Sequence, residues 1–157
     1  MSIEKVRAYF KQFDIEDRVI EFATSSATVE LAAQAAGCEP ARIAKTLSFK
    51  VGEECVLIVC AGDAKIDNAK YKAEFHTKAK MIPFLEVEDK IGHAAGGVCP
   101  FALKSGVEVY LDNSLKKYPT VFPACGSGNS AIELTSQQLE NYSDNFIKWI
   151  DVTKDYE

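Results

Sequence analysis

The chain has 157 residues, of which 47% are hydrophobic and 26% are charged, proportions typical of one globular domain with a sizeable core. No apolar run approaches the roughly 18 residues that a membrane-spanning helix needs, and the first residues lack the apolar stretch of a signal peptide. The net charge of −5 disfavours broad nucleic-acid binding but leaves room for a local contact with the single-stranded end of an RNA. We therefore expect a soluble, cytoplasmic protein of one domain, residues 1–157, with neither DNA nor a membrane as a partner.

The spacing of apolar residues predicts helices and strands in mixed order. In chain order we expect a helix at 3–13, a strand at 18–23, a helix at 29–36, strands at 45–51 and 54–61, helices at 67–75 and 85–91, strands at 107–111, 120–124 and 131–135, a helix at 136–142 and a strand at 146–152. Thr28 is suited to begin the second helix, and Gly37 and Gly92 are suited to end helices. Because the elements do not alternate strictly, the expected fold class is mixed α/β: one mixed, partly barrel-like sheet surrounded by helices.

The five cysteines form no recognisable framework. Their number is odd, no two make a CxxC pair, and neither His76 nor His93 has a partner at zinc-finger spacing. In a chain without a signal peptide this favours reduced thiols, several of them in the core. We expect neither a metal nor another cofactor. Cys99 and Cys125 stand apart, because each lies in a segment rich in glycine or proline.

The segment 92–101, here called the glycine loop, is the most unusual part of the sequence. It contains Gly92, Gly96, Gly97 and Pro100, a density that regular helices and strands do not tolerate. The segment matches neither a dinucleotide-binding GxGxxG motif nor a Walker A motif. It is either an ordinary turn or a loop that brings bare backbone N–H groups to a ligand.

Lys45 is the most informative single residue, because it shares a strand face with Leu47 and Phe49. A lysine in this register either snorkels at the strand end or points into a cavity. In a cavity its ammonium could bind a phosphate, a carboxylate or a developing oxyanion. Asp63 and Lys65 follow a buried strand, where pocket residues often lie; the alternative is an ion pair in a surface turn.

Two further segments have an ordinary and a functional interpretation. Residues 125–129 link two strands and form either a bulged hairpin or a nest of backbone donors. A basic stretch is either a solvated helix face or a local contact surface, and it consists of Lys65, Lys70, Lys72, Lys78 and Lys80.

No nucleophilic triad can be placed in the sequence. His93 could serve as a base, and it could equally be a surface residue. If the protein is an enzyme, positioning and oxyanion stabilisation should carry the reaction rather than an activated side-chain nucleophile.

Several motifs occur in an order that resembles one known family. Ala32 and Ala33 with the strand 43–50 resemble its helix and lysine strand, 62–67 its Gly-Asp turn, and 92–101 its glycine loop. Residues 109–112 and 124–134 resemble its closing strands. The family is YbaK/EbsC, the aminoacyl-tRNA deacylases related to the editing insertion domain of bacterial prolyl-tRNA synthetase.

The resemblance implies hydrolysis of the ester between a small amino acid (Cys, Ala, Ser or Thr) and the terminal adenosine of a mischarged tRNA. Lys45 matches the family's essential lysine and is the expected catalytic residue, holding the acceptor end and stabilising charge at the ester. Backbone N–H groups around Gly96 and Gly97 would fix the substrate, and a positioned water would attack. The expected substrate-binding residues are Thr24, Ser26, Asp63, Gly96, Gly97, Val98, Cys99, Pro100, Gly126 and Ser127.

Two departures from the family pattern affect this expectation. Cys99 and Ala102 stand where many relatives carry other small residues, which could alter side-chain selection. Residues 127–129 replace an arginine-containing turn, which could weaken contact with the RNA. The expected partners are the acceptor end of aminoacyl-tRNA and a synthetase. Two alternatives remain: a non-catalytic module that binds tRNA ends or a synthetase, and a protein that acts on another small nucleotide or acyl ligand.

Overall fold

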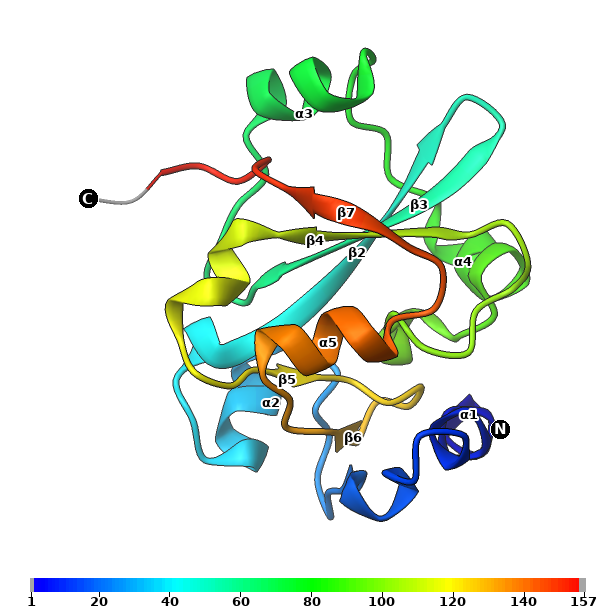
Figure 1. Cartoon of the computed structure of the whole chain (residues 1–157), viewed down its shortest axis with the longest axis vertical. Coiled ribbons are helices and arrows are strands. Elements are labelled where there is room, and N and C mark those ends of the chain that lie inside the picture. The colour runs from blue at the N-terminus through cyan, green and yellow to red at the C-terminus, as the bar shows by residue number, and fades with distance from the viewer. Residues whose placement is uncertain (1, 156–157) are drawn as a thin grey trace.

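The computed structural model of the chain describes residues 2–155 and is organised around a five-stranded sheet of order β5-β2-β3-β4-β7 (Figure 1). The strands are β2 (Ile43–Val51), β3 (Glu54–Ala61), β4 (Glu108–Asp112), β5 (Phe122–Pro123) and β7 (Phe146–Ile150). β2 and β3 are antiparallel, whereas the β2–β5, β3–β4 and β4–β7 pairs are parallel. The sheet is curled like half of a barrel, so the expected mixed, partly barrel-like sheet is confirmed.

Helices cover both faces of this sheet. They are α1 (Ser2–Lys11), α2 (Val29–Ala36), α3 (Asn68–Phe75), α4 (Phe84–Ile91) and α5 (Ser136–Tyr142), with 3-10 turns η1 (Glu16–Arg18), η2 (Pro40–Arg42), η3 (Ala95–Gly97) and η4 (Asn113–Lys117). None of these helices has the length and apolarity that crossing a bilayer requires within residues 2–155.

β3 is the central strand because its side chains alternate between two apolar clusters. Leu57 and Val59 lie in the larger cluster, with residues of α1, α4 and α5. Val56 and Ile58 lie in a second cluster with Tyr71 of α3. Both sides of β3 are therefore covered, as its uninterrupted apolar sequence predicts.

Local signals explain where the helices begin and end. The Thr28 hydroxyl accepts a hydrogen bond from the Leu31 N–H at the start of α2, and Gly37 ends this helix with a φ of +70°. Gly92 ends α4 with a φ of +105°. These are the helix limits that the sequence predicts.

Three of the expected strands are much shorter than predicted. The predicted strand 18–23 is reduced to β1 (Ile20–Glu21), which pairs with β6 (Ser130–Ala131) in a separate two-stranded sheet. Beyond β6 the chain changes partner, since the Ile132 N–H donates to the Pro123 carbonyl. The segment 130–134 thus divides its hydrogen bonds between two neighbours, and neither pairing becomes a long ladder.

Asp112 ties the carboxyl ends of β4 and β7 together. Its fully buried carboxylate accepts hydrogen bonds from the Val152 N–H at 2.8 Å, the Ser114 N–H at 2.9 Å and the Thr153 hydroxyl at 2.8 Å. The Ser114 hydroxyl in turn accepts from the Ala61 N–H at the end of β3. One carboxylate therefore holds the turn after β4 and the chain that follows β7.

We predict that Asp112→Ala lowers the free energy of unfolding by about 3 kcal/mol, because buried donors lose a charged acceptor. Thr153→Val removes one of these hydrogen bonds and should cost about 1 kcal/mol. Urea titrations followed by circular dichroism would measure both. An Asp112→Ala loss no larger than that of Thr153→Val would contradict the role given to the carboxylate.

Candidate functional site

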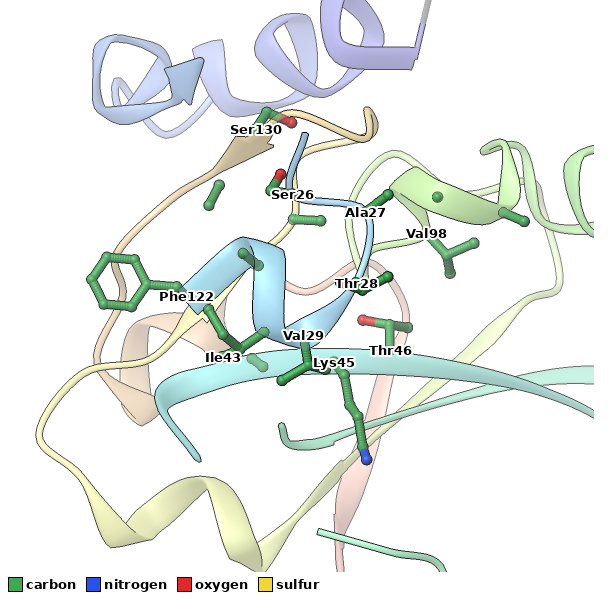
Figure 2. Close-up of a pocket in the computed structure, with 16 residues that line it drawn as sticks. Ser26, Ala27, Thr28, Val29, Ile43, Lys45, Thr46, Val98, Phe122 and Ser130 are labelled. Atoms are coloured by element: carbon green, nitrogen blue, oxygen red, sulfur yellow. The ribbon is translucent and has the colours of Figure 1, made fainter. Parts of the chain in front are cut away.

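A cavity of about 110 Å³ lies where segments distant in sequence meet (Figure 2). Its walls come from the chain before α2 and the first turns of that helix, the start of β2, the glycine loop, and residues 122–131. The residues that line it are Ser26, Ala27, Thr28, Val29, Ala32, Ile43, Ala44, Lys45, Thr46, Ala95, Gly96, Val98, Phe122, Ala124, Ser130 and Ala131. Most of these side chains are small, which leaves the backbone close to the cavity.

The cavity lies beside a gap in the pairing of β2. On one edge β2 pairs with β3 from Ala44 to Val51, whereas on the other edge β5 pairs only with Ile43 and Ala44. Further along this second edge, the Ile82 N–H donates to the Ser48 carbonyl and the Lys50 N–H to the Lys80 carbonyl. Within residues 2–155, no strand pairs with 45–47 on this edge.

Two prolines bound this gap. Pro123 is the last residue of β5 and lies opposite Ala44, and Pro83 follows the segment that pairs with Ser48. Proline has no N–H to donate to a ladder, so neither neighbouring segment can extend its pairing into the gap. Backbone groups of alternate residues point to the same edge of a strand, so Thr46 directs its N–H and C=O toward the gap, as Ser48 and Lys50 do.

Two hydroxyls at the cavity lack a hydrogen-bond partner. The oxygens of Ser26 and Thr46 are buried, and neither has a partner within the described part of the chain. The Ser26 N–H donates to the Gly128 carbonyl at 2.6 Å, which fixes the backbone at this position. An unpaired buried hydroxyl costs about 1–3 kcal/mol, so both oxygens favour a polar group in the cavity.

The glycine loop is held by close backbone packing. A Cβ atom on Gly97 would lie 2.5 Å from the Gly126 carbonyl carbon and 2.6 Å from the Ser127 nitrogen, so only glycine fits there. Gly126 itself has a φ of +91°. Gly97 is thus anchored against residues 126–127, while Gly96 and Val98 on either side of it line the cavity.

Lys45 has its backbone at the cavity and its ammonium elsewhere. Figure 2 shows its side chain leaving β2 on the side opposite to Thr46 and Val98. There the ammonium donates a hydrogen bond to the Ala64 carbonyl. Thr46 thus directs its side chain toward the cavity, whereas the Lys45 ammonium lies on the other side of the strand.

The other predicted substrate-binding residues fall into three groups. Ser26, Gly96 and Val98 line the cavity. Cys99 and Pro100 are buried residues at the end of the glycine loop, and Gly97 packs against Gly126 and Ser127; none of these five lines the cavity. Thr24 and Asp63 are exposed and do not line the cavity.

Sequence reasoning missed Thr46, Thr28 and Ser130 as cavity residues. For Thr46 a signal was available, since a strand that places Lys45 on one face must place Thr46 on the other. Thr28 and Ser130 carried no such signal, because only the assembled fold brings them to β2.

His93 and Cys99 lie together in the core and do not form a nucleophilic pair. His93 is fully buried, so the interpretation as a surface residue is wrong; its Nε2 lies 2.6 Å from the Phe101 carbonyl and 3.5 Å from the Cys99 sulfur. Burial lowers the pKa of His93 and raises the pKa of Cys99 to about 12. A thiol in this state is not a nucleophile at neutral pH. Across residues 2–155, no cluster of His, Cys, Asp and Glu is arranged to hold a metal ion.

Comparison with known proteins assigns a family to this architecture. Residues 23–142 match the family model of the aminoacyl-tRNA editing domain. The uncharacterized protein YwhH of Bacillus subtilis is 55% identical over the whole of both chains. The proline–tRNA ligase of Bacillus cytotoxicus is 25% identical over 86% of this chain, which corresponds to 24% of the ligase. A crystal structure of a candidate trans-editing enzyme for prolyl-tRNA synthetase superposes with a TM-score of 0.87, at 26% identity and 98% coverage of both chains.

The packing of the glycine loop gives a prediction about stability. Gly97→Ala should lower the free energy of unfolding by about 1–3 kcal/mol, because its Cβ would collide with rigid backbone. Gly96→Ala is the matched control: its Cβ would make an ordinary 3.5 Å contact with the Ala27 Cβ, and its stability should stay within about 0.5 kcal/mol of wild type. Thermal and urea unfolding would test the pair, and equal losses would contradict the close packing of Gly97.

Proposed function

The chain belongs to the family of aminoacyl-tRNA editing domains, and we propose that it is a trans-editing deacylase that hydrolyses the ester of a mischarged tRNA. The proposed substrate carries a small amino acid, Cys, Ala, Ser or Thr, on its terminal adenosine. The observation that supports this most directly is the cavity with two unpaired hydroxyls beside the open stretch of β2. In this proposal residues 1–157 act as one domain in the cytoplasm.

The size of the cavity supports a small amino acid. Its volume of about 110 Å³ is smaller than the cavities of about 150 Å³ that hold a benzene molecule. A side chain of one to three heavy atoms therefore fits better than an aromatic ring. The hydroxyls of Ser26 and Thr46 would pair with polar groups of the amino acid.

The reaction that suits this site is attack by a positioned water. Water adds to the ester carbonyl and gives up a proton, which forms a tetrahedral oxyanion. The oxyanion then collapses by breaking the bond to the ribose oxygen, which takes up a proton, so that the products are the free amino acid and the ribose hydroxyl. Within residues 2–155 neither histidine nor cysteine lines the cavity, so no side chain there is an activated nucleophile. The Thr46 N–H and the backbone around Gly96 would donate hydrogen bonds to the oxyanion, with no reorganisation needed at the moment of reaction.

Lys45 is the proposed catalytic side chain. Its four-carbon stem is flexible and the edge of β2 at 45–47 is unpaired, so in this proposal the ammonium leaves the Ala64 carbonyl and reaches the substrate around that edge. The ammonium would then hold the acceptor end and offset the charge that develops at the ester. Thr24 and Asp63, which are exposed, remain proposed contacts of the RNA end, and a synthetase remains a proposed partner.

Cys99, Pro100, Gly126 and Ser127 have an indirect part in this proposal. They shape the loop that presents Gly96 and Val98, so a change at Cys99 would act on amino-acid selection through the loop. The alternative function is a module that binds tRNA ends or a synthetase without turnover. The absence of histidine and cysteine from the residues that line the cavity is also compatible with this function.

The function is tested with a panel of tRNAs mischarged with cysteine, alanine, serine or threonine. The purified protein should release the amino acid from at least one of them, and Lys45→Ala should reduce kcat/KM by about 100-fold or more, the size of a lost oxyanion partner. Circular dichroism would confirm that the variant is folded. Failure of the wild-type protein on the whole panel would reject the deacylase, and full activity of Lys45→Ala would reject the role of the lysine.

Thr46→Val separates a ligand-binding hydroxyl from a structural one. Removing an unpaired buried hydroxyl should raise the free energy of unfolding by about 1 kcal/mol, whereas kcat/KM should fall about tenfold. Thr153→Val, which removes a paired hydroxyl, should lose stability and keep kcat/KM. A Thr46→Val protein that loses stability, or that keeps full activity, would show that this hydroxyl does not bind substrate.

A further inference from the structure

A second hollow continues from the cavity along β2. This hollow, the α4 groove, has a volume of about 400 Å³ and is lined by Ser48, Met81 and Phe84, among others. It shares Thr46, Ala95 and Val98 with the cavity. A ligand that fills the cavity and extends beyond it along this strand therefore enters the α4 groove.

The α4 groove exposes apolar side chains that the fold does not cover. Phe84 is 76% exposed and Met81 is 55% exposed. The aromatic ring of Phe84 and the thioether of Met81 can pack against the face of a planar ring. Every nucleobase has such a face, so stacking on an aromatic side chain does not depend on which base is present.

A cluster of lysines begins where the groove ends. Lys50, Lys78 and Lys80 line an adjoining hollow, here called the lysine cluster. The Lys50 N–H donates to the Lys80 carbonyl, and Met81, the next residue, bridges to Phe49. The lysine cluster and the groove are therefore formed by the same two paired segments.

The lysine cluster contributes three positive charges and no negative charge among the residues that line its hollow. No ion pair joins any of the three ammonium groups to a carboxylate within residues 2–155, and no Asp or Glu lines either hollow. On a chain with a net charge of −5, three unpaired lysines together favour a polyanion. A protein partner would need carboxylates here and an apolar segment for the groove, whereas one RNA strand supplies phosphates and a base in sequence.

We propose that the α4 groove binds the terminal adenosine of the aminoacyl-RNA and that the lysine cluster binds the phosphates of the nucleotides before it. This inference rests on the proposed function, because it places the amino acid in the cavity. The order along β2 is then the order of the ligand: amino acid at Thr46, nucleoside at Ser48, phosphate at Lys50. The adenine stacks on Phe84 and Met81, and the strand leaves the protein over Lys78 and Lys80.

The test is a binding measurement that does not depend on hydrolysis. The probe is a short RNA ending in CCA, labelled at its 5′ end, with alanine joined to the terminal ribose through an amide that the protein cannot hydrolyse as an ester. Fluorescence anisotropy gives its Kd for the full chain and for two groups of variants, Phe84→Ala and Met81→Ala in the groove, and Lys50→Ala and Lys80→Ala in the cluster. Leu85→Ala is the matched control for Phe84, since Leu85 is 92% exposed and does not line the groove. Lys11→Ala is the control for the lysines, since Lys11 lies on α1.

The two groups of variants should differ in how they respond to salt. Phe84→Ala should weaken binding about 5- to 150-fold without changing the salt dependence, because it removes stacking. Each lysine variant should reduce the slope of log Kd against log salt by about 0.7, the value for one phosphate contact on a single strand. Leu85→Ala and Lys11→Ala should bind as the wild type does.

The outcomes separate this inference from the proposed function. Loss of probe binding in the groove and cluster variants, together with no hydrolysis of any aminoacyl-tRNA by the wild type, would support the RNA path and reject the deacylase. Hydrolysis by the wild type with unchanged probe binding in all four variants would overturn the RNA path and leave the deacylase standing. If those four variants instead lose binding to a synthetase, the surface is a protein-docking site and the inference is wrong.

Discussion

The incomplete pairing of β2 is the constraint on which the site depends. A continuous ladder along both edges would have covered residues 45–47 and left neither an open backbone nor a cavity beside it. Pro123 and Pro83 end the neighbouring segments on either side of this gap. Along its other edge β2 is paired with β3 from Ala44 to Val51. One strand thus belongs to the framework on one edge and borders the cavity on the other.

The glycine loop is held at the cavity by close backbone packing at Gly97. Because Gly97 has no side chain, the loop can approach residues 126–127 at backbone contact distance. Gly96 and Val98 then face the cavity from a rigid support. Positioning of this kind suits chemistry on an ester that is already activated, since orientation alone supplies much of the required acceleration.

The sequence predicted the elements that carry their own local signals. Thr28, Gly37 and Gly92 mark helix ends through side-chain and backbone geometry, and the apolar run of β3 marks a strand that is covered on both faces. For β1, β5 and β6 the sequence predicts strands that are too long, because the length of each depends on which neighbouring segment its residues pair with.

The location of the site within β2 was less accessible to prediction. The alternation of side chains along a strand predicts that Lys45 and Thr46 lie on opposite faces of β2, but it does not predict which face borders a cavity. That depends on Ser26 and Gly96, which come from segments far from β2 in the sequence and reach it only in the folded protein. The complete burial of Cys99 and His93 likewise follows from the packing of the whole core and could not be predicted from the local sequence.

The buried thiol of Cys99 in the glycine loop and that of Cys125 beside it have a consequence for redox chemistry. Oxidants such as peroxide react with thiolates, and burial raises the pKa of Cys99 to about 12 and that of Cys125 well above its usual value. At neutral pH these sulfurs are therefore protonated and shielded from solvent. Low reactivity of Cys99 and Cys125 toward such oxidants would keep the packing of the glycine loop independent of the redox state of the surroundings.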